Sequence, residues 1–491
     1  MYRLPLIGIC APLVLVTVAC LISGLPAPPP SVPTAAPETQ VPTEAPPSEI
    51  APTEGPEPGF TLLPSIVNRD PSQVAQNPAL AVAGDTGNDW VAWAEDASGG
   101  VRQIFVSEIA NSEFLARGTS LNLHLNVVAD QPSITFAGEN RAVPWVAWTE
   151  PSPGFGNIAQ IFASRFNQDT GLWQLAGQDR GGAEPSLNFN TDRPAVRPFI
   201  LGGSTDPTKP ALPWVTWEEE SPSVDTSQIF VAKAFKDETG IGGFRWQPVG
   251  APNRSQEPTL NVDRLRDGRR PVLAFAETGN AVPWVAWSEE GGNRPKRIFT
   301  SRGVVDANTP GGVKWVNVPA CGGDETACAL NTNPLRDAEA PTMAAGSLTP
   351  GQASVPWIAW SEIGPSGKSQ IFVSRLDTKT RNSFLNVGAS LNVDQNHEAK
   401  LPFIVFVGKV PYVAWLEDDG TGRFTVQVRH LGSDPQTGTW TLDSPPEGFS
   451  ARTGFADLGL AATASNVLTL AWPGADSAGS VAQLFVGQVQ P

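Results

Sequence analysis

A phrase of four apolar residues recurs along most of the chain, as in Trp145-Val-Ala-Trp148. In a strand, the side chains of Trp145 and Ala147 point to one face and those of Val146 and Trp148 to the other, so both faces of such a strand need cover. Successive copies begin 55 to 73 residues apart. The seven copies are Trp90–Trp93, Trp145–Trp148, Trp214–Trp217, Trp284–Trp287, Trp357–Trp360, Tyr412–Trp415 and a worn copy that ends at Ala471 and Trp472.

Three further apolar runs accompany most copies. A turn rich in Gly, Pro and Ser leads from the phrase to a second run such as Gln160-Ile-Phe162, and two runs that flank a turn predict a hairpin. A shorter run headed by a proline, such as Pro132 or Pro402, comes before the phrase, and a run that often contains Trp, such as Trp173, comes last. Four strands in each of seven repeats predict an all-β fold, a seven-bladed β-propeller of four-stranded blades.

The two ends of the repeat region complement each other. The last repeat stops at Gln490 with no fourth run, whereas residues 60–68 precede the first repeat and match the fourth runs of other repeats. The match is clearest in Pro64-Ser-Ile-Val-Asn68, which resembles Ser120-Leu-Asn122. We therefore expect the N-terminal strand to complete and close the last blade, which removes the exposed edges of an open array.

Two segments come before the propeller, which we place at residues 59–491. Residues 1–25 are almost wholly apolar with Arg3 as the only charge, which is typical of a signal peptide or membrane anchor. Thr17-Val-Ala-Cys20 resembles the bacterial lipobox, so Cys20 is the expected site of lipid attachment; the alternative is an uncleaved membrane anchor. Residues 26–58 hold 12 prolines and predict a disordered, extended spacer. Whether the anchor is a lipid on Cys20 or an uncleaved membrane segment, we expect an extracytoplasmic protein that is anchored in the membrane at the cell surface.

Charge and cysteine usage narrow the chemistry. The formal net charge of -16 disfavours nucleic acid as a partner, because binding to its phosphates requires a basic face. Beyond the N-terminal segment the chain has two cysteines, Cys321 and Cys328, which we expect to form a local disulfide in an oxidising compartment. A metal site is the alternative, but His124, His397 and His430 are scattered along the chain. We therefore expect no cofactor.

Asp169-Thr-Gly171-Leu-Trp173 and Asp434-Pro-Gln-Thr-Gly438-Thr-Trp440 resemble worn copies of the Asp-box turn of sialidase-like, or BNR-type, propellers. The resemblance implies the propeller fold, because the Asp box in that family staples a turn away from the active site. The sialidase chemistry does not transfer, since it requires a Tyr/Glu pair and Tyr412 is the only Tyr after the signal segment. The resemblance thus implies a non-catalytic member carried on a bacterial lipoprotein.

Polar residues recur at the ends of two strands of each repeat. Propeller topology places the end of the second strand and the end of the fourth on one rim, where Asn122 and its equivalents stand. One interpretation is structural: each Glu bonds across its hairpin, as Glu150 could with Gln160, and the Asn residues cap turns. The other is a binding rim for a cation such as calcium, a glycan or a basic protein. Its members follow the Trp phrases as Trp-x-Glu, at Glu95, Glu150, Glu219, Glu289, Glu362 and Glu417.

These observations favour a surface-anchored propeller that acts as a binding or scaffold module for a protein or glycan partner. The alternative is a propeller glycoside hydrolase or lyase with a carboxylate site that no sequence motif identifies. Such an enzyme requires paired carboxylates near the central channel.

Overall fold

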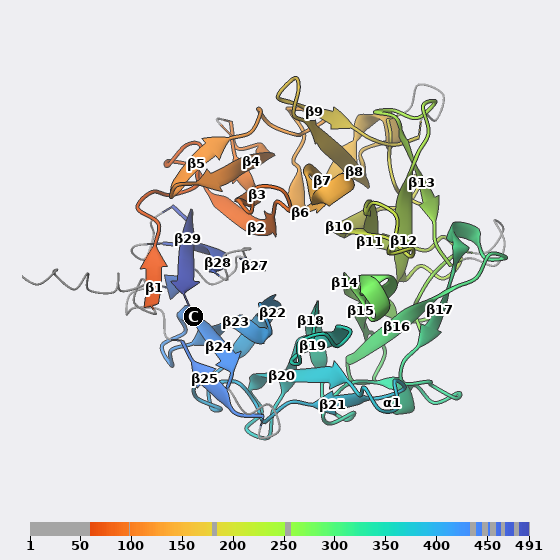
Figure 1. Ribbon diagram of the computed structural model, residues 1–491, viewed down its shortest axis with the longest axis vertical. Helices are drawn as coiled ribbons and strands as arrows, with labels where there is room; N and C mark the ends of the chain where they lie inside the picture. Colours follow the sequence, from red (N-terminus) through yellow and green to blue (C-terminus); the bar gives the residue numbers. More distant parts are fainter. Residues whose placement is uncertain are drawn as a thin grey trace, which may run out of the picture. The chain divides into compact units, whose positions relative to one another are not determined.

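The computed structural model describes residues 59–97, 99–178, 184–250, 257–432, 438–443, 450–451, 458–462, 467–475 and 481–490, and the Cys20 and spacer predictions lie outside them. The chain separates into two units, Met1–Gly55 and Pro56–Pro491. The second unit is a ring of seven blades, each made of four antiparallel strands, which confirms the predicted seven-bladed propeller (Figure 1). Among the described residues no helix has the length and apolar character needed to cross a membrane.

Blades one to six follow the chain from the central channel outward, so the first strand lines the channel and the fourth lies at the circumference, whereas the outermost strand of blade seven is the first strand of the propeller (Figure 1). Blades one to three are β2 (Ala75–Val82), β3 (Asp89–Asp96), β4 (Arg102–Ala110) and β5 (Glu113–Ala116); β6 (Asp130–Ala137), β7 (Val143–Ser152), β8 (Ile158–Asn167) and β9 (Leu172–Leu175); β10 (Ala195–Gly203), β11 (Leu212–Glu220), β12 (Ser227–Lys236) and β13 (Phe244–Pro248). Blades four to six are β14 (Asp267–Ala276), β15 (Val282–Glu290), β16 (Arg297–Val305) and β17 (Val313–Asn317); β18 (Ala338–Gly346), β19 (Val355–Ile363), β20 (Ser369–Leu376) and β21 (Phe384–Asn386); β22 (Ala399–Val407), β23 (Val410–Asp418), β24 (Phe424–Leu431) and β25 (Trp440–Leu442). Blade seven combines β27 (Gly459–Ala462), β28 (Leu468–Gly474), β29 (Gln483–Gln490) and β1 (Gly59–Leu62), while β26 (Ser450–Ala451) pairs with β24 and β28. The helix α1 (Glu325–Cys328) lies between blades four and five.

The recurrent Trp residues form the core between blades. Trp145 of blade two meets Phe244 and Trp246 of blade three edge-on, with ring centroids 5.0 and 6.3 Å apart. The Trp of the fourth strand adds a polar staple, because the indole Nε1 of Trp246 donates to the backbone oxygen of Ala176 in the preceding connection. Facing blades therefore supply the cover that strands apolar on both faces require.

The first and the last strand of the propeller meet in blade seven. Strand β1 pairs antiparallel with β29, with Phe60 opposite Val489, and the ring of Phe60 lies 6.0 Å from that of Trp472. Beyond β1, Leu63 and Val67 are buried and their N–H groups donate to the backbone oxygens of Val486 and Leu484. The N-terminal residues thus supply the outer strand that the C-terminal repeat lacks.

The first strand of each of the first six blades contains a β-bulge immediately before its proline. In blade two the register shifts between Asp130 and Ser133, and Gln131 takes a φ of 54° ahead of Pro132. A non-glycine residue in the left-handed region is uncommon, and a bulge redirects a side chain at the end of a strand. Each bulge turns one residue toward an end of the central channel, and these residues are Asn77, Gln131, Arg197, Arg270, Ala340 and Leu401.

Candidate functional site

The Glu residues of the predicted rim are buried in a repeated set of hydrogen bonds. Glu150 accepts the indole N–H of Trp148 at 2.9 Å and the backbone N–H groups of Leu123 and His124 at 3.0 and 2.7 Å. Trp and Glu two positions apart lie on one face of a strand, so the indole reaches the carboxylate directly. The same three donors, an indole and two consecutive backbone N–H groups, serve Glu95, Glu150, Glu219, Glu289, Glu362 and Glu417.

The Asn residues form the other half of this arrangement. The side-chain oxygen of Asn122 accepts the N–H of Ile104 in blade one, and its amide donates to the backbone oxygens of Arg102 and Val127. Asn122 thus ties the connection to blade one, while the next two residues tie it to Glu150 of blade two. Each Asn and Glu pair staples two neighbouring blades through the segment that joins them. We name these segments, which run from a fourth strand to the next first strand, the inter-blade connections.

This geometry favours the structural interpretation of the six Glu residues, with different partners from those expected. Glu150 and Gln160 are cross-strand neighbours, yet Gln160 donates to the backbone oxygen of Thr191 and accepts from Ser186. A buried carboxylate that already accepts three N–H groups presents no free oxygen to a cation or basic partner. The binding-rim hypothesis therefore gains no support from these residues, and within the described part of the chain no cluster of three His, Cys, Asp or Glu side chains could hold a metal ion.

Burial changes the acidity of two of these carboxylates. It raises the pKa of Glu289 to about 7, an effect that hydrogen bonds from Trp287, Val262 and Asp263 partly offset. Burial also raises the pKa of Glu150, again against its hydrogen bonds. In both cases desolvation of the charged form outweighs the donors.

Cys321 and Cys328 are joined by a disulfide that closes the loop ahead of blade five. The loop also carries α1, whose Glu325 carboxylate pairs with the largely buried guanidinium group of Arg297. Arg266, which is also buried, lies 3.6 Å from the same carboxylate. The disulfide therefore fixes a segment that neutralises two buried cations.

The inter-blade connections present apolar side chains to solvent on one face of the ring. Leu265 and Leu335, at equivalent turn positions in consecutive connections, are 74% and 79% exposed, and Leu125 and Val393 in other connections are 63% and 50% exposed. The turn that carries Leu265 is held firmly: Asn261 donates to the backbone oxygen of Arg266, and Glu289 accepts the N–H groups of Val262 and Asp263. The exposed side chain of Leu265 thus projects from a backbone that hydrogen bonds to Asn261 and Glu289 hold in place.

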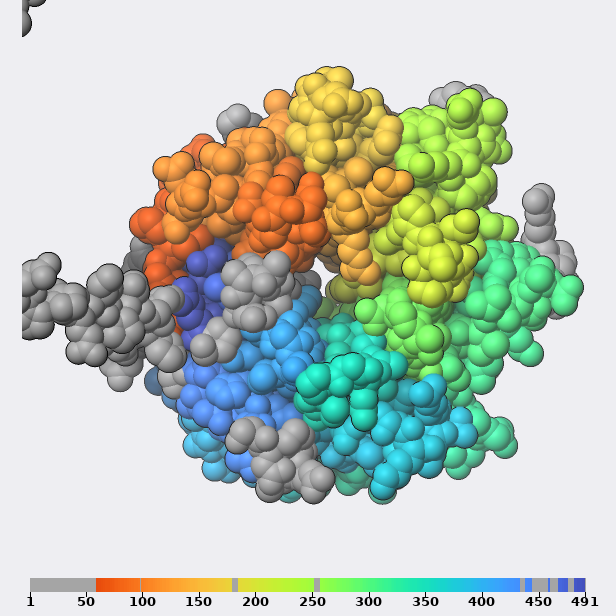
Figure 2. Space-filling model, viewed as in Figure 1, coloured from red at the N-terminus to blue at the C-terminus, as the bar shows by residue number. Residues whose placement is uncertain are grey.

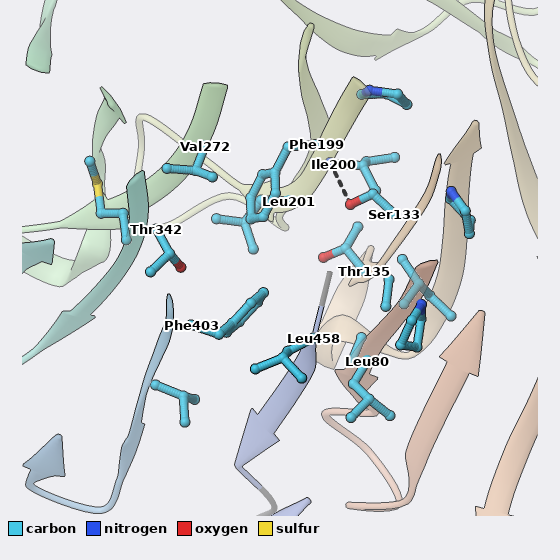
Figure 3. Close-up of a pocket in the computed structure, with 18 of the residues that line it drawn as sticks. Leu80, Ser133, Thr135, Phe199, Ile200, Leu201, Val272, Thr342, Phe403 and Leu458 are labelled. Carbon is cyan, nitrogen blue, oxygen red and sulfur yellow. Dashed lines mark hydrogen bonds between the residues drawn. The ribbon is translucent and has the colours of Figure 1, made fainter. Parts of the chain in front are cut away.

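A cavity of about 430 Å³ occupies the middle of the ring. The space-filling view shows the opening at the centre, and the close-up shows Phe199, Leu201, Thr342 and Phe403 around the cavity (Figures 2 and 3). The bulges form its mouth on the face of the inter-blade connections, because each bulge begins a first strand directly after a connection. Among the described residues that line it none is Asp, Glu or His, and its charged residues are Arg141, Arg197 and Arg270.

Sequence reasoning missed the residues at this mouth. In the sequence each of these residues stands directly before the proline that heads a first strand. That proline indicates where the strand begins but does not indicate that the preceding residue faces the cavity. Glu218, next to a residue of the predicted rim, was also missed: it is buried and accepts the backbone N–H of Arg270 at 2.7 Å. Its carboxylate also lies 3.3 Å from the guanidinium groups of Arg197 and Arg269.

No family model and no curated protein matches the sequence. Among solved structures, a protein of unknown function from Dyadobacter fermentans is 13% identical with a TM-score of 0.44, covering 76% of this chain and 98% of its own. A Hadza microbial sialidase is 10% identical with a TM-score of 0.42, covering 85% of this chain and 66% of its own. An α-L-arabinanase from Penicillium chrysogenum, solved with arabinobiose, is 12% identical with a TM-score of 0.42, covering 73% of this chain and 92% of its own. These likenesses assign neither an activity nor a substrate to this chain.

Proposed function

We propose that this chain is a binding module, held at the cell surface by its N-terminal segment, that docks a protein partner on the face of the inter-blade connections. The observation that carries the proposal is the exposure of Leu265 and Leu335 at the same turn position of consecutive connections. Large apolar side chains that stand exposed at a repeated position on one face of a domain are the kind of group that an interaction surface uses.

The staples beneath these side chains support the same role. An interface loses affinity when its loops must be ordered on binding, so a backbone that is already fixed lowers that cost. Glu289 and Glu362 hold the connections of Leu265 and Leu335 through two backbone N–H groups each. In this account the six Glu residues serve binding indirectly, because they position the connections.

The exposed groups favour a protein over a glycan as the partner. They are branched aliphatic side chains, which supply the apolar centre of protein interfaces. The Trp side chains of the repeated phrases, which could stack on a sugar, are buried between blades.

Capture of binding proteins by the immobilised full chain tests this proposal. We expect a partner to be retained by the parent and lost by the double variant Leu265→Glu/Leu335→Glu. The matched control is Val304→Glu/Val305→Glu, which changes two exposed apolar residues on β16, away from the connections. Equal capture by the parent and the Leu265/Leu335 variant would contradict the proposal. If the parent bound to a glycan array and the Leu265→Glu/Leu335→Glu variant did not, the partner would be a glycan and not a protein.

A further inference from the structure

The wall of the central cavity is mainly hydrocarbon. Phe199, Leu201 and Phe403 border it, and the close-up shows their side chains around one shared space (Figure 3). Ser133 and Thr135 also line it, but their hydroxyl oxygens accept the backbone N–H groups of the next blade at 3.0 and 2.9 Å. These two oxygens therefore serve the packing of one blade on another.

One hydroxyl group in the wall lacks such a bond. Thr342 follows Pro341 on β18 as Ser133 follows Pro132 on β6, and both side chains border the cavity. No residue in the described part of the chain forms a hydrogen bond with the hydroxyl of Thr342, which belongs to a residue only 5% exposed. Figure 3 shows its oxygen turned toward the cavity. Thr342 thus offers a ligand an uncharged group that can donate or accept a hydrogen bond.

The charges at the mouth on the face of the inter-blade connections are paired within the protein. The carboxylate of Asp130 accepts hydrogen bonds from Arg102 at 2.6 Å and from the amide of Asn77 at 2.7 Å. The backbone N–H of Gln131 donates to it as well, at 2.8 Å. This carboxylate therefore has no need of a cation from a ligand.

The arginines at the mouth are engaged in the same way. The buried carboxylate of Glu218 lies 3.3 Å from the guanidinium groups of Arg197 and Arg269. Arg270, whose backbone N–H donates to Glu218, has a further partner. Arg141, beyond the other end of β6, is exposed, so water can solvate its charge. An ionised ligand would have to disrupt these pairs, whereas an uncharged ligand leaves them intact.

The volume is that of a small-molecule site. Ligand pockets span roughly 300 to 1,000 Å³ and are lined mostly by apolar groups with a few polar groups that fix orientation. This cavity measures about 430 Å³. From the bulge at Gln131 to the end of β6 at Ala137 the first strand extends roughly 20 Å at about 3.3 Å per residue, so the cavity suits an elongated molecule.

We infer that the central cavity binds an uncharged, elongated apolar molecule with a single polar oxygen, such as a medium-chain alcohol. The oxygen forms a hydrogen bond with the hydroxyl of Thr342, and the hydrocarbon chain packs against Phe199, Leu201 and Phe403 and leaves water. This site is separate from the docking of a protein on the leucines of the connections, so either inference can fail without the other.

Calorimetric titration of the full chain with decanol and with its charged analogues tests the inference. We expect decanol to bind, and its affinity to fall about fourfold for each methylene group removed, through octanol to hexanol, because each buried methylene leaves water. Decanoate and decylammonium should bind about tenfold more weakly than decanol or worse, since the cavity would strip water from their charges without a free counter-charge. Absence of decanol binding, or binding of either ion as tightly as decanol, would overturn the inference.

A variant of Thr342 tests where the oxygen lies. Thr342→Val removes the hydroxyl group and keeps the shape of the side chain, so decanol should bind about fivefold more weakly. The matched control is Thr61→Val, the same change at an exposed position of β1 on the circumference, and it should leave the affinity unchanged. An unchanged affinity in Thr342→Val would overturn the assignment of the oxygen to Thr342.

Two cavity-filling variants separate this site from binding elsewhere on the chain. Val272→Trp and Ala344→Leu occupy the space from different blades and should abolish or strongly weaken the titration with decanol. Melting temperatures and near-UV circular dichroism show which variants keep the fold, and one folded variant suffices. Thr342→Val adds no volume and carries the test if neither filled variant folds. A decanol titration that a folded cavity-filled variant leaves intact would overturn the inference.

Discussion

In blade six the indole Nε1 of Trp415 donates a 2.7 Å hydrogen bond to the carboxylate of Glu417, two residues further along the same strand. The same carboxylate accepts the backbone N–H groups of Val393 and Asp394 at 2.9 and 2.7 Å, from the connection that leads into the blade. One side chain therefore satisfies three donors from two parts of the chain. Without it, three N–H groups would lack an acceptor.

Glu417→Gln should destabilise the fold by roughly 1 to 3 kcal/mol, because the new amide nitrogen would face N–H donors in a buried site. An exposed Glu in a hairpin would contribute about 1 kcal/mol or less, so the size of the loss reports burial. Denaturant unfolding measures it. Glu113→Gln, at an exposed position on β5, is the control and should change little. Equal stability of the two variants would contradict the role of Glu417 as a staple.

Removal of the N-terminal strand should open blade seven. A chain that begins at Arg69 lacks β1, the buried residues Leu63 and Val67, and Asn68, whose side-chain oxygen accepts the N–H of Leu484. The lost burial alone should cost several kcal/mol. The comparison is a chain that begins at Gly59, which keeps all these contacts. A melting temperature within a degree or two of that reference would show that β1 does not close the ring.

Asp89 should make stability depend on pH. Burial raises its pKa to about 7, although the hydroxyl of Thr469 donates to it. The folded state therefore holds this proton to higher pH than the unfolded state does. The stabilisation is complete below the ordinary pKa of about 4 and is lost as pH rises through 7.

Asp89→Asn removes the charge and keeps an acceptor for Thr469. At pH 8 we expect the variant to be more stable than the parent, by a few kcal/mol at most, and its stability to vary less between pH 4 and 8. Thermal unfolding across this range measures the effect. Asp85→Asn, on an exposed turn of the same blade, should keep the slope of the parent. If the stability of the parent and of Asp89→Asn changed with pH in parallel, Asp89 would not be the source of the pH dependence.

Replacing both cysteines of the disulfide should loosen the segment around α1. The cross-link spans seven positions, and chain entropy for so short a loop gives roughly 2.5 kcal/mol. We expect Cys321→Ser/Cys328→Ser to unfold at lower denaturant, and dithiothreitol to shift the parent in the same direction without affecting the variant. If dithiothreitol also destabilised the Cys321→Ser/Cys328→Ser variant, loss of this disulfide would not explain its effect on the parent.

The blades and their order could be predicted from the sequence because one local pattern repeats. Trp148 and Glu150 also lie on one face of a strand by simple alternation, so their contact was accessible to the same reasoning. The other two donors to Glu150 are the backbone N–H groups of Leu123 and His124, which lie in the preceding connection. No local sequence pattern predicts these two bonds. The sequence therefore predicted a bond across the hairpin or a binding rim, and not the link from Glu150 to the preceding connection.

The cavity mouth was hidden for a different reason. A proline disfavours helical geometry in the residue before it, so a strand headed by Pro198 or Pro271 was predictable. That Arg197 and Arg270 adopt left-handed conformations and turn toward the channel depends on the bulge, which forms only when the strand pairs with its neighbour.

Site-specific photocrosslinking in intact cells that make this protein tests the central claim most directly. A benzophenone amino acid at position 265 or 335 lies on the face of the inter-blade connections, and one at position 305 lies on β16 as the control. We predict that one protein is crosslinked from positions 265 and 335 and not from position 305. Crosslinks of equal yield from all three positions, or from position 305 alone, would contradict a docking face on the connections.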